Sequence, residues 1–140
     1  MRVMAIDYGD ARTGVAISDP TGTLTGSTAV LPSRNREVLL EALAALAAEH
    51  RVETLVLGLP RNMDGTEGPR AALCREFAAE LERATGSAVV LWDERRSTIE
   101  AHQILHTGGK REKQHKKNVD AVAASLILEG YLTRRRREAP

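Results

Sequence analysis

The stretch Val3-Met4-Ala5-Ile6-Asp7-Tyr8-Gly9-Asp10-Ala11-Arg12-Thr13-Gly14 decides how the rest of the chain is interpreted. Its apolar run predicts a strand that ends at Asp7, followed by a tight turn and a second strand from Gly14. The two glycines would let the backbone approach a bound phosphate closely. We expect Asp7 to bind a metal ion and Arg12 to contact a phosphate oxygen with two hydrogen bonds. A plain hairpin turn would use the same Asp-x-Gly pattern.

Apolar runs separated by turns continue beyond this stretch. Further elements are predicted as strands at 28–31, 54–57 and 88–92, and as helices at 35–49, 69–84, 97–106 and 119–132. The short early connections indicate an antiparallel meander, whereas strand–helix–strand units indicate right-handed parallel crossovers. The sequence therefore predicts an α/β fold with a mixed five-stranded sheet, three antiparallel N-terminal strands and then two parallel ones, flanked by helices. We expect one domain over residues 1–133 and a basic tail over 134–140.

Composition excludes several classes of protein. With 140 residues, 42% hydrophobic and 28% charged, the chain fits one globular domain without general disorder. An aromatic content of 3% argues against a surface of aromatic platforms for single strands. The single cysteine, Cys74, excludes an intramolecular disulfide and a multi-cysteine zinc cluster. No signal peptide is found, and no apolar run approaches the ~20 residues of a membrane span, so we expect a cytoplasmic protein without a membrane partner.

Positive charge is concentrated near the C-terminus, because basic side chains outnumber acidic ones only after residue 109. Clusters of this kind are candidate phosphate contacts. We assign that role to Lys116 and Lys117, which lie close to Asp120 in the sequence. Arg134–Arg137 is interpreted as a solvated, frayed end of the chain.

Two further carboxylates stand at the ends of predicted elements. Glu94 follows the strand at 88–92, and Asp120 opens the last helix, with Asn118 as its N-cap. Ligands in mixed α/β sheets bind beyond the carboxyl ends of the parallel strands, so we expect Asp7, Glu94 and Asp120 to share a pocket. Like charges a few Å apart cannot all stay ionised unless a cation joins them. The sequence therefore predicts a site for one or two Mg²⁺ or Mn²⁺ ions.

The carboxylate next to Glu94 has a different expected role. Side chains alternate along a strand, so Asp93 and Glu94 point to opposite faces, and only one of them can face the site. We choose Glu94 and interpret Asp93 as a salt-bridge or capping partner. Arg95, the next residue, is a candidate phosphate contact.

The long polar segment 58–68 is a second candidate for function, because loops between a buried strand and a helix often carry binding residues. Arg61, Asn62 and Thr66 offer donors for a sugar-phosphate backbone. Asp64 and Glu67 could join the metal site, although a turn role and a helix-start role are the simpler interpretations.

Four motifs in this order resemble the YqgF/RuvX family over Met1 to about Leu132: Asp-x-Gly…Arg-x-Gly, Gly-Leu-Pro-x-Asn-x-Asp-Gly, Asp-Glu-Arg and Val-Asp-Ala-x-Ala-Ala. The resemblance implies a ribonuclease H-like fold and a metal-dependent nuclease whose acidic triad falls on Asp7, Glu94 and Asp120. It also implies a role in maturing the 5′ end of precursor 16S ribosomal RNA, during ribosome biogenesis. Two positions depart from the family pattern: Asp10 replaces a small hydroxyl residue, and Arg96 replaces a leucine.

Our main hypothesis is a divalent-metal-dependent phosphodiesterase that acts on nucleic acid, with Arg12, Arg61, Asn62, Arg95, Lys116 and Lys117 holding the backbone. The alternatives are a Holliday junction resolvase acting on branched DNA in recombination and repair, and a non-catalytic nucleic-acid-binding module. An ATPase of the actin/hexokinase superfold would need two such domains, and 140 residues hold one. A symmetric junction would favour a homodimer, and the sequence leaves both substrate and oligomeric state open.

Overall fold

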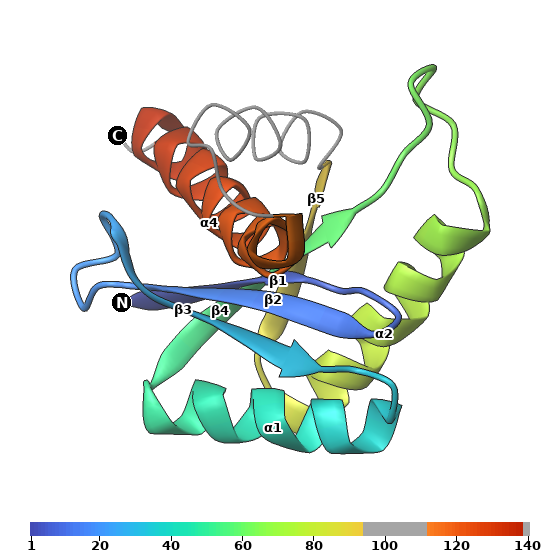
Figure 1. Cartoon of the computed structure of the whole chain (residues 1–140). Coiled ribbons are helices and arrows are strands. Elements are labelled where there is room, and N and C mark those ends of the chain that lie inside the picture. Colours follow the sequence, from blue (N-terminus) through green and yellow to red (C-terminus); the bar gives the residue numbers. More distant parts are fainter. Residues whose placement is uncertain (94–111, 139–140) are drawn as a thin grey trace.

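The fold is built on a mixed five-stranded sheet, seen in a computed structural model that describes residues 1–93 and 112–138 (Figure 1). The strands lie in the order β3-β2-β1-β4-β5. β2 pairs antiparallel with β1 and with β3, whereas β1, β4 and β5 run parallel. The strands are β1 (Arg2–Asp7), β2 (Arg12–Ser18), β3 (Thr25–Pro32), β4 (Val52–Leu59) and β5 (Ala88–Asp93). The predicted sheet, with its antiparallel meander followed by two parallel strands, is confirmed.

Three helices flank this sheet in the part of the chain that the structure describes: α1 (Arg36–Glu49), α2 (Pro69–Thr85) and α4 (Glu112–Glu138). α1 begins where predicted, because the Asn35 side chain accepts a hydrogen bond of 3.2 Å from the backbone N–H of Val38. α2 has proline at its first position and ends at Gly86, whose φ of 70° is the left-handed conformation that glycine adopts readily. The helix predicted at 97–106 lies outside the described residues.

The two faces of the sheet bury separate cores. Alternate residues of β1 divide between them, since Met4 and Ile6 belong to the core under α1 and α2, and Val3 and Ala5 to the core under α4. Figure 1 shows α4 crossing one face of the sheet while α1 covers the other. Asp7 continues the alternation of Val3 and Ala5, so it stands on the α4 face.

Small side chains let α4 lie close to the sheet. The sheet contributes Ala5, Ala16 and Val56 to the core under α4, and all three are fully buried. The closest approach is at Gly14 of β2, where an added Cβ would lie 2.0 Å from the backbone carbonyl oxygen of Asp120. No residue with a side chain fits there unless the helix moves.

Both ends of α4 differ from the prediction. The helix begins at Glu112 rather than after Asn118, so the predicted N-cap at Asn118 is wrong, and Asp120 lies well inside the helix. It also continues past Leu132 to Glu138, so the frayed end predicted for Arg134–Arg137 is wrong. Glu, Lys, Gln and Arg are good helix formers, and cations near a helix C-terminus are favourable. Within the described residues, no helix has both the length and the apolar content needed to cross a membrane.

Candidate functional site

Asp7 and Asp120 come together on the α4 face of the sheet, as predicted for two of the three carboxylates. Asp7 is the last residue of β1 and pairs with Gly14 of β2. Because the backbone of Asp120 rests on that same Gly14, the two carboxylate residues flank one position of the sheet. They are 113 positions apart in the sequence, and the contact depends on the absence of a side chain at Gly14.

The electrostatics of Asp120 reflect this environment. Asp120 stands one helical turn before the buried Ala124, at the end of the apolar stripe of α4, and its side chain is 22% exposed. Burial raises the pKa of Asp120 above its usual value; the Arg12 guanidinium opposes this, and the nearby charge of Asp7 adds to it. The two carboxylates therefore repel one another in the protein without a bound ion.

One oxygen of Asp120 is poorly satisfied. Its Oδ2 atom is buried and accepts no hydrogen bond from the described residues. The Arg12 Nε atom lies 3.2 Å away and supplies a counter-charge, although this contact lacks hydrogen-bond geometry. A buried carboxylate oxygen with spare acceptor capacity beside a second carboxylate fits a divalent ion, since Mg²⁺ and Mn²⁺ prefer hard oxygen ligands.

The third predicted ligand, Glu94, lies outside the described residues, as does Arg95. Across residues 1–93 and 112–138, no group of three or more His, Cys, Asp or Glu side chains could hold a metal ion. Asp93, the last residue of β5, approaches Arg61, with its Oδ2 atom 4.0 Å from Nη1. This geometry agrees with the predicted salt-bridge role of Asp93.

The turn after β1 is fixed from two sides. At Gly9, an added Cβ would lie 2.2 Å from the carbonyl oxygen of Arg12, so the tight turn requires glycine. Arg70 of α2 donates to the carbonyl oxygen of Tyr8 at 2.6 Å, stacks over the Tyr8 ring and forms an ion pair with Asp10. The unusual Asp10 thus ties the turn to the start of α2. Sequence patterns did not single out Arg70, because its partners are some sixty positions away.

The polar loop after β4 is internally bonded. Asn62 donates from its side-chain amide to the Thr66 hydroxyl at 2.9 Å, and Asp64 accepts from the Thr66 backbone N–H at 2.9 Å. The turn role of Asp64 is confirmed. Glu67 accepts two hydrogen bonds from Arg75, which are the main cause of the lowered pKa of Glu67. The Nε atom of Arg61, a candidate phosphate contact, lies 3.7 Å from the Oε2 atom of Glu67.

The remaining cationic candidates lie at the start of α4. Lys116 and Lys117 fall within its first two turns, which places them on the helix that carries Asp120. The distance along the helix axis is about 1.5 Å per residue, so both backbones lie within about 6 Å of Asp120 in that direction.

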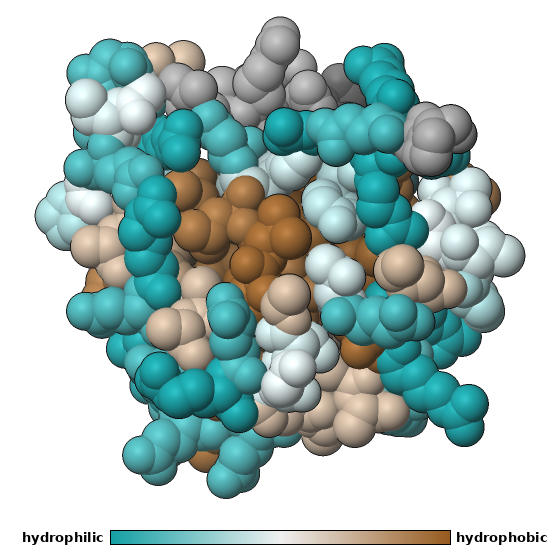
Figure 2. Space-filling view, turned by 180° about the vertical axis from the view of Figure 1, so that it is seen from behind, coloured by the Kyte–Doolittle hydropathy of each residue, from teal (hydrophilic) through white to brown (hydrophobic). Residues whose placement is uncertain are grey.

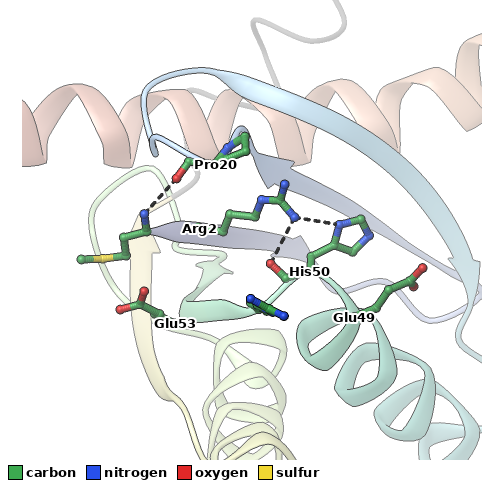
Figure 3. Close-up of a pocket in the computed structure, with 7 residues that line it drawn as sticks. Arg2, Pro20, Glu49, His50 and Glu53 are labelled. Atoms are coloured by element: carbon green, nitrogen blue, oxygen red, sulfur yellow. Dashed lines mark hydrogen bonds between the residues drawn. The ribbon is translucent and has the colours of Figure 1, made fainter.

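A cavity at the opposite end of β1 is unrelated to the carboxylates. It has a volume of about 410 Å³ and is lined by residues that include Arg2, His50 and Glu53. Figure 3 shows Arg2 reaching toward His50, where its Nη1 atom lies 3.2 Å from the backbone carbonyl oxygen. Arg2 begins β1 and Asp7 ends it, so this cavity is about 17 Å from the candidate site along the strand.

Comparison with known proteins agrees with the fold and the motifs. The family model described as "RuvX: Holliday junction resolvase" matches residues 1–134. This chain belongs to the RuvX family. A relative from Halothermothrix orenii, named "Putative pre-16S rRNA nuclease", is 43% identical over 132 residues, which cover 94% of each chain. The predicted family is confirmed.

Solved structures support the fold. The structure of Thermus thermophilus RuvC in complex with a Holliday junction substrate aligns with 99% of this RuvX chain. The alignment covers 98% of the RuvC chain, with a TM-score of 0.61 and 15% sequence identity. The structure of a ROK family protein from Streptococcus pneumoniae aligns with 76% of this chain, and the alignment covers 39% of the ROK chain. The TM-score is 0.51 and the sequence identity is 16%. At these identities both likenesses concern the fold alone. The predicted ribonuclease H-like fold is confirmed.

Proposed function

We propose that this RuvX-family protein is a divalent-metal-dependent nuclease that hydrolyses phosphodiester bonds and processes the 5′ end of precursor 16S ribosomal RNA in the cytoplasm. The names of its relatives support the substrate. The observation that carries the chemistry is the pair of Asp7 and Asp120, with a buried Asp120 oxygen that accepts no hydrogen bond from the residues the structure describes. We assign residues 1–133 to one nuclease domain.

We infer that Glu94 completes a triad with Asp7 and Asp120. Support comes from the sheet: Trp92 of β5 packs against the core under α4, so its neighbour Asp93 belongs to the opposite face and pairs with Arg61 instead. If the same alternation extended one residue beyond β5, position 94 would lie on the face of Trp92. One or two Mg²⁺ or Mn²⁺ ions, when bound by these residues, would activate water and stabilise the leaving oxygen of the phosphodiester.

In this proposal, the Arg12 guanidinium binds Asp120 in the absence of a metal ion and a phosphate oxygen in its presence. Without an ion its guanidinium neutralises Asp120, and with Asp120 engaged by a cation it is available to a phosphate oxygen. Arg61, Asn62, Arg95, Lys116 and Lys117 would contact the rest of the backbone. Contacts of this kind make affinity fall with rising salt.

The test is a cleavage panel with Mg²⁺ and with Mn²⁺ on precursor ribosomal RNA, single-stranded RNA, single-stranded DNA and a four-way junction. Asp7→Asn keeps the shape of the side chain but removes its charge, and we expect cleavage to fall to background. The matched control is Asp10→Asn, because the Asp10 side chain is 91% exposed and outside the carboxylate pair. Mn²⁺ titration by calorimetry should show weaker binding to Asp7→Asn only. Full cleavage by purified Asp7→Asn would refute this mechanism.

A Holliday junction resolvase is the second candidate function, because the description of the matching family names that activity. A resolvase would cut the four-way junction in preference to linear substrates and would act as a homodimer, since the junction is symmetric. The same panel decides between the two, with the mass of the protein in solution as a second measurement.

A further inference from the structure

The aromatic side chains of this chain fall into two pairs. It has one Trp, one Phe and two Tyr. Tyr8 and Phe77 stack face to face, with ring centroids 4.0 Å apart, in the core on the α2 side. Trp92 and Tyr131 lie on the α4 side, with centroids 6.3 Å apart and planes at 82°, and both are half-buried. The rings outside the main core therefore stand together, where β5 meets α4.

Trp92 has a fixed position against α4. At Gly130, an added Cβ would lie 2.9 Å from the Trp92 Cζ2 atom, so the indole sits in a notch that glycine leaves in the helix. A ring packed in this way loses little conformational entropy when a ligand arrives, which favours binding. Trp92 also precedes the carboxyl end of β5 by one residue, at the edge where Asp7 ends β1.

Arginines surround this aromatic pair. The Arg134 guanidinium carbon lies 5.9 Å from the centroid of the Trp92 ring, and that of Arg135 lies 5.9 Å from the centroid of Tyr131. Arg134 forms an ion pair with Glu138, 2.9 Å apart, but both side chains are about two-thirds exposed. Such exposed pairs contribute little, so Arg134 can exchange its carboxylate for a phosphate at small cost.

Two cavities adjoin Trp92, and both include Trp92 and Arg134 in their linings. The first has a volume of about 230 Å³, and its lining includes Val90, Tyr131 and Arg135. A second cavity of about 480 Å³ is lined by Trp92 together with Gly130, Thr133 and Arg137. β5 is the edge strand of the sheet, and Figure 2, which views the molecule from behind, shows an apolar area bordered by hydrophilic side chains on that side.

We propose that these two cavities form one groove, the Trp92 groove, which binds single-stranded nucleic acid on the same face of the sheet as the proposed cleavage site. Cations at a helix C-terminus alone would be explained by the helix dipole, but that does not account for two partly exposed rings beside them. Rings for bases and arginines for phosphates are the combination that single-strand-binding proteins use. The low aromatic content argued against such a surface; the placement of the rings, rather than their number, argues for it.

The groove has a defined spacing from the carboxylates. Arg134 follows Asp120 by fourteen positions on the same helix, which is about 21 Å along its axis. At about 3.4 Å per stacked nucleotide, this spans about six nucleotides. A trinucleotide bound at the carboxylates cannot reach Arg134, whereas a dodecanucleotide can. This proposal rests on the proposed function, because it assumes that the ligand is a nucleic-acid strand.

The experiment uses Trp92 as its own probe, since it is the single Trp of the chain. The full chain carrying Asp7→Asn, which should not cleave, is titrated with a single-stranded RNA dodecamer while Trp fluorescence is excited at 295 nm. We expect a saturable change in emission that weakens as salt rises. Adding Arg134→Ala or Arg137→Ala should weaken dodecamer binding. In a plot of the logarithm of the binding constant against the logarithm of the salt concentration, the slope should become shallower by about 0.7 for each phosphate that is no longer neutralised. Binding of a trinucleotide should stay the same.

The matched control is Arg83→Ala, which removes an exposed arginine from the last turn of α2 on the other side of the sheet. Circular dichroism establishes that each variant is folded. The proposal is overturned if the dodecamer leaves Trp92 emission unchanged, or if both groove variants bind the dodecamer as tightly as Arg83→Ala does. In either case, cleavage by the wild type would still support the proposed nuclease function. An emission change that follows protein concentration without RNA would instead assign the groove to a second copy of the chain and would equally overturn the proposal. Loss of cleavage on every substrate in the panel, with the dodecamer still bound at Trp92, would count against the nuclease and support the groove.

Discussion

The two faces of the sheet differ in the size of the side chains they bury. Under α1 and α2 the sheet contributes large residues such as Met4, Ile6 and Leu57, all fully buried. Under α4 the sheet offers mainly small residues, and at Gly14 no side chain at all. Large side chains fill a core and stabilise it, whereas small ones let backbones approach. From this comparison we expect the α2 face to contribute more of the stability and the α4 face to carry the proposed chemistry.

The α4 face also carries the two partly buried carboxylates. Asp7 and Asp120 stand close together at one end of the contact, and their mutual repulsion opposes folding in the absence of an ion. On the α2 face, the buried polar residue of β2 is Thr13, which alternates with Val15 and Ile17 and carries no charge. An arrangement that opposes folding on one face has to be compensated by the packing on the other.

The largest expected effect separates stability from activity on the α2 side. Leu43→Ala in α1 removes a fully buried side chain far from the carboxylates, and we expect a loss of about 2–5 kcal/mol of unfolding free energy. Cleavage per folded molecule should be unchanged at a temperature well below the melting point. The control is Val38→Ala in the same helix, whose side chain is 52% exposed. Urea unfolding and the cleavage assay measure the two quantities, and a loss of specific activity in Leu43→Ala would contradict the division between the faces.

The second-largest effect on stability is expected from a substitution at Gly14. Gly14→Ala places a methyl group against the backbone of Asp120, so α4 must shift away from β2. We expect a loss of about 1–3 kcal/mol of stability from overpacking, together with weaker Mn²⁺ binding because Asp120 moves relative to Asp7.

The control for Gly14 is Gly68→Ala, because an added Cβ at Gly68 meets nothing within 4 Å. Calorimetry with Mn²⁺ on both variants makes the comparison. Unchanged Mn²⁺ affinity in Gly14→Ala would mean that the close contact of α4 and β2 does not position the carboxylate.

The smallest effect concerns the pKa of Asp120. Because burial raises this pKa in the folded protein, the folded state takes up a proton more readily than the unfolded state does. Stability in the absence of metal should therefore rise as the pH falls from neutral through the folded pKa, and this contribution is complete below the unfolded pKa. Asp120→Asn should melt slightly higher than the wild type at pH 7 without metal, and Mn²⁺ should raise its melting point less than that of the wild type. Thermal melts in EDTA and in Mn²⁺ at pH 5 and pH 7 provide the measurement. If the wild type melts at a higher temperature than Asp120→Asn in EDTA at pH 7, the prediction that the charged Asp120 destabilises the metal-free protein is wrong.

Local patterns in the sequence predicted the sheet well. The run Val3–Ile6, the cap at Asn35 and the stop at Gly86 each depend on neighbouring residues, and the structure confirms all three. The start of α4 was wrong because Asn118 is also a good N-cap, and the helix-forming residues before it extend the helix. A local pattern cannot decide between two compatible starts when packing along the whole helix contributes.

The site was predictable only in part, for a similar reason. Asp7 and Asp120 could be chosen because each ends or opens an apolar run. The roles of Gly14, Arg70 and Gly130 depend on partners that are far away in the sequence, Asp120, Asp10 and Trp92 respectively. Nothing within a few positions of these residues differs from an ordinary turn, helix start or helix interior.

The continuity of α4 has one more consequence. Asp120 and Arg134 belong to a single unbroken helix, so a movement of that helix along the sheet displaces both of them together. If both proposals are correct, α4 acts as a rigid spacer: the number of nucleotides between the bond that is cut and the point where the strand is anchored is determined by helical rise, independently of base sequence. Inserting one turn of helix between the two positions would move the cut by one or two nucleotides.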